Sequence, residues 1–175
     1  MSGYTYEQVR DIIQDGDVIF FHGDWSNPLH AVIMFFTCSP FSHCATAFWN
    51  ESQTGRRLMV VESQGGSKRR MSPLSFYADR IMTIVPGLKP WGDVADFALG
   101  RIGEAEYSWS EAIYVGVRDF LKTYFETSIP KYSSEHETCS EFIAEMYGIP
   151  DKRVSPQGLY DELIKISEAR TVTGA

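Results

Sequence analysis

Residues 138–150 read TCSEFIAEMYGIP, and this run carries a helix start, an apolar stripe and a helix stop in succession. Thr138 and Glu141 have the spacing of a capping box, in which the threonine hydroxyl accepts a backbone hydrogen bond and the glutamate reaches back to the threonine N–H. Gly148 and the proline after it are a typical helix end. The pattern predicts a helix that ends at Gly148 and has Cys139 at its first position.

This position makes Cys139 a candidate nucleophile. The unpaired N–H groups and the positive dipole end at a helix start favour an anion. They therefore lower the pKa of a thiol there, and the thiolate is the reactive form. The alternative is that Cys139 only begins the apolar stripe of this helix and packs in the core. The stripe continues through Phe142, Ile143, Met146 and Tyr147.

A thiol hydrolase also needs a base, and His43 is the best placed of the four histidines. It opens a predicted strand directly after the turn 39–42, where a rigid sheet can hold an imidazole for proton transfer. The alternative is an ordinary half-exposed strand histidine. His136 is the second candidate base because it is close to the cysteine in sequence, although its charged turn suggests a solvated side chain. We expect His22 and His30 to be surface or loop-packing residues.

Glu62 is the candidate for the residue that orients the histidine ring. It follows the apolar run 58–61 on a strand that we expect to pair with the His43 strand. A buried carboxylate needs a donor, and a hydrogen bond from His43 would provide one. The alternative is a glutamate on the solvent-facing side of the strand.

Further along the chain, strand patterns precede helix patterns. The expected elements are a helix over 5–14, a strand over 18–21, a hairpin of 43–49 and 57–63 around a turn at 50–55, a strand over 81–85, and helices over 93–102, 110–124, 138–147 and from Ser155 and Pro156 onward. The apolar run 29–36 fits either a helix or a strand. Strands followed by helices predict an α+β fold, an antiparallel sheet packed on helices, in a single domain spanning 1–175.

Composition limits the class of protein. The chain has 175 residues, 16 Lys and Arg against 23 Asp and Glu, and a formal net charge of -7. This balance disfavours nucleic-acid binding through bulk electrostatics. The first seven residues lack a secretory-signal pattern, and no apolar stretch approaches the roughly 20 residues of a transmembrane helix. Three cysteines do not form a disulfide framework. We therefore expect a cytoplasmic protein with no transmembrane segment.

Two other motifs have weaker functional interpretations. Cys38 and Cys44 flank His43, but no Cys-x-x-Cys or His-x-x-x-His pair accompanies them, so a zinc site is disfavoured. Gly65 and Gly66 precede the run 67–70 without a phosphate-loop frame, which predicts a turn with a solvated basic patch. Three aromatic residues are candidates to line a groove or fill the core: Trp25, Phe41 and Trp49.

Four segments together resemble a known family. They are GDVIF at 16–20, TCSPFSH at 37–43, VVES at 60–63 and TCSEF at 138–142. Their order is similar to that of the circularly permuted NlpC-type papain-like hydrolases of the YiiX/YaeF kind, in which the histidine comes first and the cysteine late. The resemblance implies a circularly permuted papain-like fold, a nucleophile at Cys139, a general base at His43 and an orienting residue at Glu62.

The chain departs from the related lecithin:retinol acyltransferase-like branch. That branch has a second histidine and an Asn-Cys-Glu-His run, whereas no histidine lies between His43 and His136 here. The resemblance implies a thiol hydrolase, a cysteine peptidase, amidase or esterase, acting on a peptide or acyl-lipid substrate without a cofactor or metal. Two alternatives remain open: a catalytically inactive papain-like binding module, and a redox or metal protein that uses Cys38, Cys44 and Cys139. The sequence gives no indication of the oligomeric state.

Overall fold

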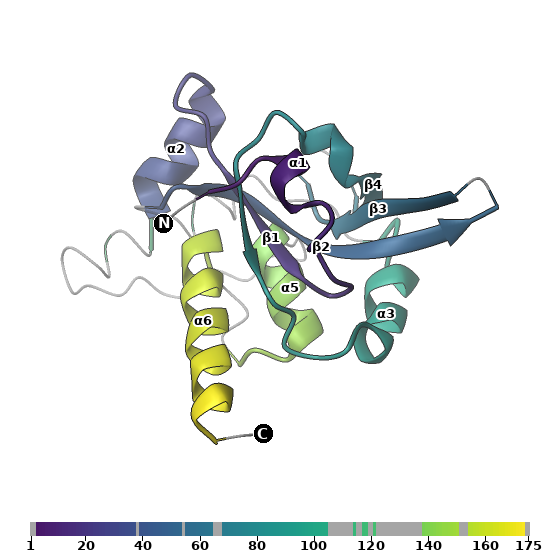
Figure 1. The fold of residues 1–175 in the computed structure, drawn as a ribbon. Coiled ribbons are helices and arrows are strands. Elements are labelled where there is room, and N and C mark those ends of the chain that lie inside the picture. Colours follow the sequence, from purple (N-terminus) through teal and green to yellow (C-terminus); the bar gives the residue numbers. More distant parts are fainter. Residues whose placement is uncertain are drawn as a thin grey trace.

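The structure is a computed structural model that describes residues 3–37, 39–53, 55–64, 68–104, 138–150 and 154–173, with four isolated positions at 114, 117, 118 and 121. Its centre is an antiparallel sheet with the strand order β4-β3-β2-β1-β5 (Figure 1). The described elements are α1 (Tyr6–Val9), β1 (Val18–His22), α2 (Pro28–Thr37), β2 (Phe41–Ser52), β3 (Gly55–Glu62), β4 (Arg70–Pro73), the 3-10 helix η1 (Leu74–Tyr77), β5 (Met82–Val85), α3 (Trp91–Gly100), α5 (Cys139–Tyr147) and α6 (Pro156–Thr173). The predicted α+β class is confirmed, and circular permutation stays a prediction.

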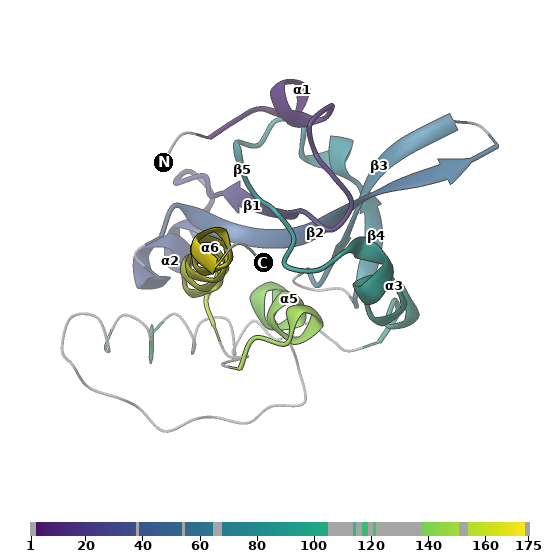
Figure 2. The same cartoon turned by 60° about the horizontal axis from the view of Figure 1, so that its bottom comes forward.

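Both faces of the sheet are covered. Alternate side chains of β1, β2 and β3 pack against α3, α5 and α6 on one face, and the others pack against α1 and η1 on the opposite face. Figure 2 shows α3, α5 and α6 together on one side of the sheet and α1 on the other. Phe20 and Phe21 illustrate this alternation, since both are fully buried but belong to opposite clusters. We call these the α5-side cluster and the α1-side cluster.

The predicted hairpin is confirmed and is longer than expected. The β2–β3 pairing extends from Thr46↔Val61 to Ser52↔Gly55, so the strands continue through most of the predicted turn at 50–55. Gly55 has a φ of 121°, a backbone conformation that residues with a Cβ atom rarely adopt. The described pairing therefore continues to Ser52 and Gly55.

The first helix is shorter than predicted. Its cap forms as expected, with the Thr5 N–H donating to the Gln8 side chain at 2.8 Å, but α1 ends at Val9. The expectation of a helix over 5–14 is wrong beyond that point because the following backbone binds β2. Trp49 Nε1 donates to the Ile13 carbonyl at 3.0 Å, and the Gly16 N–H donates to the Ala47 carbonyl at 2.8 Å, so this segment is held against β2.

The later helices follow the prediction closely. The undecided run 29–36 is the helix α2, and α3 begins and ends two residues earlier than expected. Gly148 ends α5 with a φ of 70°, and the Ser155 hydroxyl accepts the Gly158 N–H at the start of α6. The helix expected over 110–124 lies outside the described residues except at isolated positions. No helix in the described part of the chain has the length and apolar character needed to cross a bilayer.

The interpretation of 67–70 as a solvated basic patch is wrong for Arg69. Arg69 is only 5% exposed, because its guanidinium lies over the Phe142 ring at 4.9 Å and pairs with Glu104 at 3.8 Å. Arg70 begins β4, a strand that the sequence did not predict. Lys68 is the exposed residue of this run, and Gly65 to Ser67 lie outside the described residues.

Candidate active site

The structure brings together Cys139, His43 and Glu62, which come from three separate elements. Cys139 is the first residue of α5, His43 lies near the start of β2, and Glu62 ends β3. His43 Nε2 lies 2.7 Å from Glu62 Oε2, and the same ring is hydrogen-bonded to the Cys139 thiol. Since Nε2 faces the carboxylate, Nδ1 is the ring nitrogen left for the thiol.

The pairing of β2 explains how α5 reaches the strand. Ala47 exchanges backbone hydrogen bonds with residues 16–17 on the β1 side. In an antiparallel strand the backbone groups of alternate residues point to opposite neighbours, so those of Thr46 and Cys44 point toward β3. The β2–β3 register begins at Thr46, and the Cys44 N–H donates instead to the Cys139 sulfur. The start of α5 thus docks where β2 extends beyond its partner strand.

Glu62 is fully buried, which removes the alternative of a solvent-facing strand glutamate. Its carboxylate accepts from His43 and also from Arg70 Nε at 3.0 Å, Ser72 Oγ at 2.9 Å and Tyr77 Oη at 2.6 Å. Burial alone would raise the pKa of Glu62, but the hydrogen bond and charge of His43, with the Tyr77 and Arg70 donors, lower it to about 2. A buried carboxylate with four donors is therefore held in its charged form.

The pKa values of the histidine and the cysteine move in opposite directions. Burial alone would lower the pKa of His43, but hydrogen bonds to Cys139 and Glu62 raise it to about 9. The pKa of the Cys139 thiol lies well below its usual range because the Cys44 thiol and the His43 ring both stabilise the thiolate against the effect of burial. These directions favour a thiolate–imidazolium pair at neutral pH.

The His43 ring is also held by its packing. It stacks on Phe21, with ring centroids 5.5 Å apart and an angle of 18° between the planes, and its centroid lies 6.2 Å from that of Tyr77. The His43 side chain is 12% exposed, so its orientation is fixed by neighbours rather than by solvent. A fixed ring can transfer protons along one defined direction.

The first turn of α5 supplies donors beside the thiol. Thr138 accepts the Glu141 N–H at 3.3 Å, the Glu141 carboxylate accepts the Thr138 N–H at 2.8 Å, and the helical ladder begins with Phe142 N–H to the Thr138 carbonyl. Helix geometry leaves the N–H groups of Cys139 and Ser140 outside this ladder. Such donors stabilise negative charge that develops on a carbonyl oxygen attacked by the neighbouring sulfur.

The other predicted histidines have different positions. His22, half-buried rather than on the surface, lies with Nε2 2.9 Å from Thr83 Oγ1, and His30 Nδ1 accepts the Asp24 N–H at 3.3 Å. His136 and Cys38 lie outside the described residues.

Sequence reasoning missed three site residues and named a fourth, Cys44, only for the redox or metal alternative. Arg70, Ser72 and Tyr77 hold Glu62, and Cys44 contacts the candidate nucleophile. Of these four residues, only Cys44 had a signal in the sequence. Strand alternation predicts that its side chain lies on the face opposite His43, and that face packs against α5. Within the described ranges, no group of three His, Cys, Asp or Glu side chains is placed to hold a metal ion.

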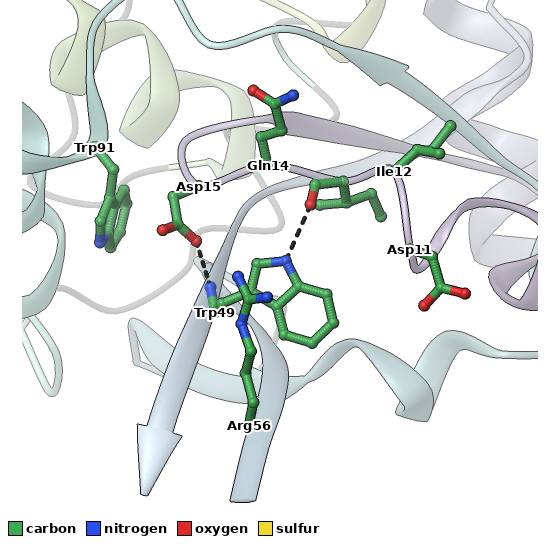
Figure 3. A pocket seen from close by; sticks show the side chains of 8 residues that line it. Asp11, Ile12, Gln14, Asp15, Trp49, Arg56 and Trp91 are labelled. Atoms are coloured by element: carbon green, nitrogen blue, oxygen red, sulfur yellow. Dashed lines mark hydrogen bonds between the residues drawn. The ribbon is translucent and has the colours of Figure 1, made fainter.

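A separate pocket of about 790 Å³ lies at the other end of β2 (Figure 3). Its walls include Trp49, Trp91 and Arg56, and the Arg56 guanidinium lies 4.2 Å from the centroid of the Trp49 ring. Trp49 is six residues from His43 along the strand, a separation of about 20 Å at the usual rise per residue. Cys139, His43 and Glu62 are not among its lining residues. Of the other two aromatic candidates, Phe41 is fully buried in the core and Trp25 is 67% exposed.

The chain was compared with family models, curated proteins and solved structures. No protein-family model matches the chain, and no curated protein matches its sequence. The chain has a fold similar to that of the metalloprotein YiiX (DUF1105) from Escherichia coli O157:H7. The two chains are 18% identical, the match covers 85% of this chain and 92% of that chain, and the TM-score is 0.47.

Proposed function

We propose that the protein is a cysteine-dependent hydrolase that cleaves an amide or ester through a thioester at Cys139. The observation that carries the proposal is the continuous hydrogen-bonded chain from Cys139 to His43 to Glu62. Nucleophile, base and orienting carboxylate in that sequence are the elements of an activated thiol. The domain that we assign to this activity spans residues 1–175.

In the proposed reaction, the Cys139 thiolate attacks the carbonyl carbon of the substrate. The N–H groups at the start of α5 stabilise the oxyanion that forms. The His43 imidazolium then gives its proton to the leaving amine or alcohol, and the acyl group stays on sulfur. His43, now neutral, takes a proton from water, which attacks the thioester and releases the acid and the free thiolate.

Glu62 keeps its charge throughout this cycle. Its low pKa, about 2, means that it orients and stabilises the imidazolium and does not itself exchange the proton. Tyr77 and Ser72 hold the two carboxylate oxygens in place. Peptide amides and acyl-lipid esters or amides are the substrate classes that fit this chemistry, and the reaction requires no cofactor.

The experiment that tests the proposal is acylation by a small activated ester such as p-nitrophenyl acetate. We expect a burst of nitrophenolate and an acetyl group on Cys139, detected by peptide mass spectrometry. His43→Ala should lower the rate of both acylation and release, and Cys38→Ser serves as the matched thiol control. Acetylation that is equally fast in Cys139→Ala would overturn the proposal, as would a wild-type Cys139 that stays unmodified.

The competing interpretations give different results in the same assay. A catalytically inactive binding module would show no burst with any ester or peptide. A metal protein would bind zinc or another divalent ion with loss of Cys139 labelling, and a chelator would restore that labelling. The proposed hydrolase should turn over peptide p-nitroanilides or acyl-lipid analogues equally well before and after treatment with chelator.

A further inference from the structure

Cys44 is a buried thiol that contacts the candidate nucleophile and forms no bond to the substrate in the proposed hydrolysis. It lies on β2, is fully buried, and belongs to the same α5-side cluster as Cys139, which is 3% exposed. The two side chains are hydrogen-bonded, and the Cys44 N–H donates to the Cys139 sulfur as well. The Cys139 sulfur therefore lies against both the side chain and the main chain of Cys44, and both thiols are free.

The two thiols differ in charge. Burial and the neighbouring Cys139 raise the pKa of Cys44, so Cys44 stays protonated, whereas Cys139 is held as the thiolate. Peroxides react with thiolates, and a sulfenic acid formed in this way condenses readily with an adjacent thiol. The charge difference therefore determines which sulfur is oxidised first and which one responds.

We propose that Cys44 is the resolving cysteine for Cys139, and that a peroxide converts the pair into a reversible intramolecular disulfide. The proposal rests on the contact between the two sulfurs and does not require hydrolase activity. It assigns a modification site at the candidate nucleophile and predicts that oxidation silences the thiol without destroying it.

The chemistry balances with hydrogen peroxide as the oxidant. The Cys139 thiolate attacks one peroxide oxygen, the O–O bond breaks, and the departing hydroxide takes the His43 proton to form water. The Cys44 sulfur then attacks the sulfur of the Cys139 sulfenic acid, and the S–O bond breaks. The departing hydroxide takes the Cys44 proton to form a second water. Two thiols lose two electrons, and one peroxide gains them.

The surrounding structure suits a short link between the two residues. A disulfide requires Cα atoms roughly 4.4–6.8 Å apart. Because the Cys139 sulfur already contacts the Cys44 backbone N–H and thiol, we expect side-chain rotation to close the bond while α5 stays on the sheet.

The test uses the full chain at neutral pH with hydrogen peroxide, followed by alkylation and peptide mass spectrometry without reduction. We expect a cross-linked pair of peptides containing Cys44 and Cys139, lighter than the free peptides by two hydrogen atoms. Iodoacetamide labelling of Cys139 should be lost on oxidation and recovered after dithiothreitol. In Cys44→Ser, Cys139 should instead gain two oxygen atoms as sulfinic acid, and dithiothreitol should not restore labelling.

Cys38→Ser is the matched control and should behave as wild type. Far-ultraviolet circular dichroism would show whether the buried serine impairs folding, and Cys44→Ala provides a second variant in that case. If neither variant folds, the presence or absence of the Cys44–Cys139 cross-link in the wild type tests the proposal. The proposal is overturned if wild-type Cys139 becomes sulfinic acid as fast as in Cys44→Ser, or if Cys139 pairs with Cys38. If the disulfide forms but Cys139 is not acylated by the ester, only the hydrolase proposal is overturned. If Cys139 is acylated but no disulfide forms, only the proposal for Cys44 is overturned.

Discussion

Replacing Glu62 with glutamine removes the negative charge that faces the His43 ring while it keeps the size of the side chain and one oxygen acceptor. In the native structure that carboxylate lies 2.7 Å from Nε2 and is one of the two groups that raise the pKa of His43 to about 9. Without the charge, the imidazolium is less stable relative to the neutral ring. We therefore expect the pKa of His43 to fall in Glu62→Gln.

The size of the shift follows from the strength of the interaction. A hydrogen bond to a charged group contributes about 1.5–3 kcal/mol, and one pKa unit corresponds to about 1.4 kcal/mol. Loss of the charge should lower the pKa of His43 by roughly 1–2 units, from about 9 to roughly 7–8. The thiolate–imidazolium pair would then be lost at a lower pH on the alkaline side, because the imidazolium loses its proton earlier. The lower pH limit of the pair, which the cysteine sets, should change little.

Nuclear magnetic resonance titration of the His43 ring measures this shift directly and needs no substrate. Glu51→Gln is the matched control, because Glu51 lies on the same hairpin with an 83% exposed side chain and should leave the titration unchanged. The reasoning is refuted if the pKa of His43 in folded Glu62→Gln stays near 9, or if Glu51→Gln shifts it by as much.

Three further predictions concern the same network. Tyr77→Phe removes a 2.6 Å hydrogen bond to buried Glu62 and should lower the free energy of unfolding by about 1–3 kcal/mol in urea, whereas Tyr4→Phe at an exposed position should have no measurable effect. Limiting iodoacetamide should label Cys139 before the other cysteines, at a rate that rises with pH through a pKa well below about 8.5. His43→Ala should slow the labelling of Cys139 at neutral pH, and equal labelling of all three cysteines would contradict the assignment of Cys139 as the nucleophile. The raised pKa of His43 contributes stability that is fully present below about 6.5 and is lost as the pH rises through about 9, and the lowered pKa of Glu62 contributes stability that is present above about 4.5 and is lost as the pH falls through about 2. Both contributions are complete between about pH 4.5 and 6.5. The lowered pKa of Cys139 adds stability as the pH rises toward the ordinary thiol value and so opposes the loss from His43, whereas Cys139 and Glu62 both lose stability as the pH falls. Denaturant midpoints should therefore decline as the pH falls below about 4.5.

Local patterns were sufficient for much of the fold. The cap at Thr138 and the stop at Gly148 define α5 because both signals act within a few residues of the backbone they control. The hairpin was predictable for the same reason. The almost wholly apolar run 29–36 had no periodicity that could distinguish the helix α2 from a strand. The helix expected over 5–14 was overestimated because the segment after Val9 bonds to β2 through Ile13 and Gly16, and these tertiary contacts leave no local signal.

The candidate site was only partly visible in the sequence. Cys139, His43 and Glu62 could be named from their positions on predicted elements, and their catalytic roles stay predictions. The donors around Glu62 could not be found in this way. Arg70 belongs to a basic run that predicts solvent exposure, and Tyr77 lies on a 3-10 turn too short to leave a periodic pattern. Their roles come from the packing of β4 and η1 beside β3, which depends on strand order rather than on neighbours in sequence.

The arrangement around Glu62 is better explained by chemistry than by stability. Taking a carboxylate fully out of water costs several kcal/mol, and apolar residues of similar volume often stabilise a core at least as well as a buried ion pair. Here the chain places four donors on one buried carboxylate and directs one of them, the His43 ring, toward a thiol at a helix start. A network that only stabilised the sheet would need no cysteine at its end and no thiolate to balance the imidazolium. Arg70 and the other donors offset part of the cost of burying Glu62, and His43 is the donor among them that also contacts the sulfur of Cys139.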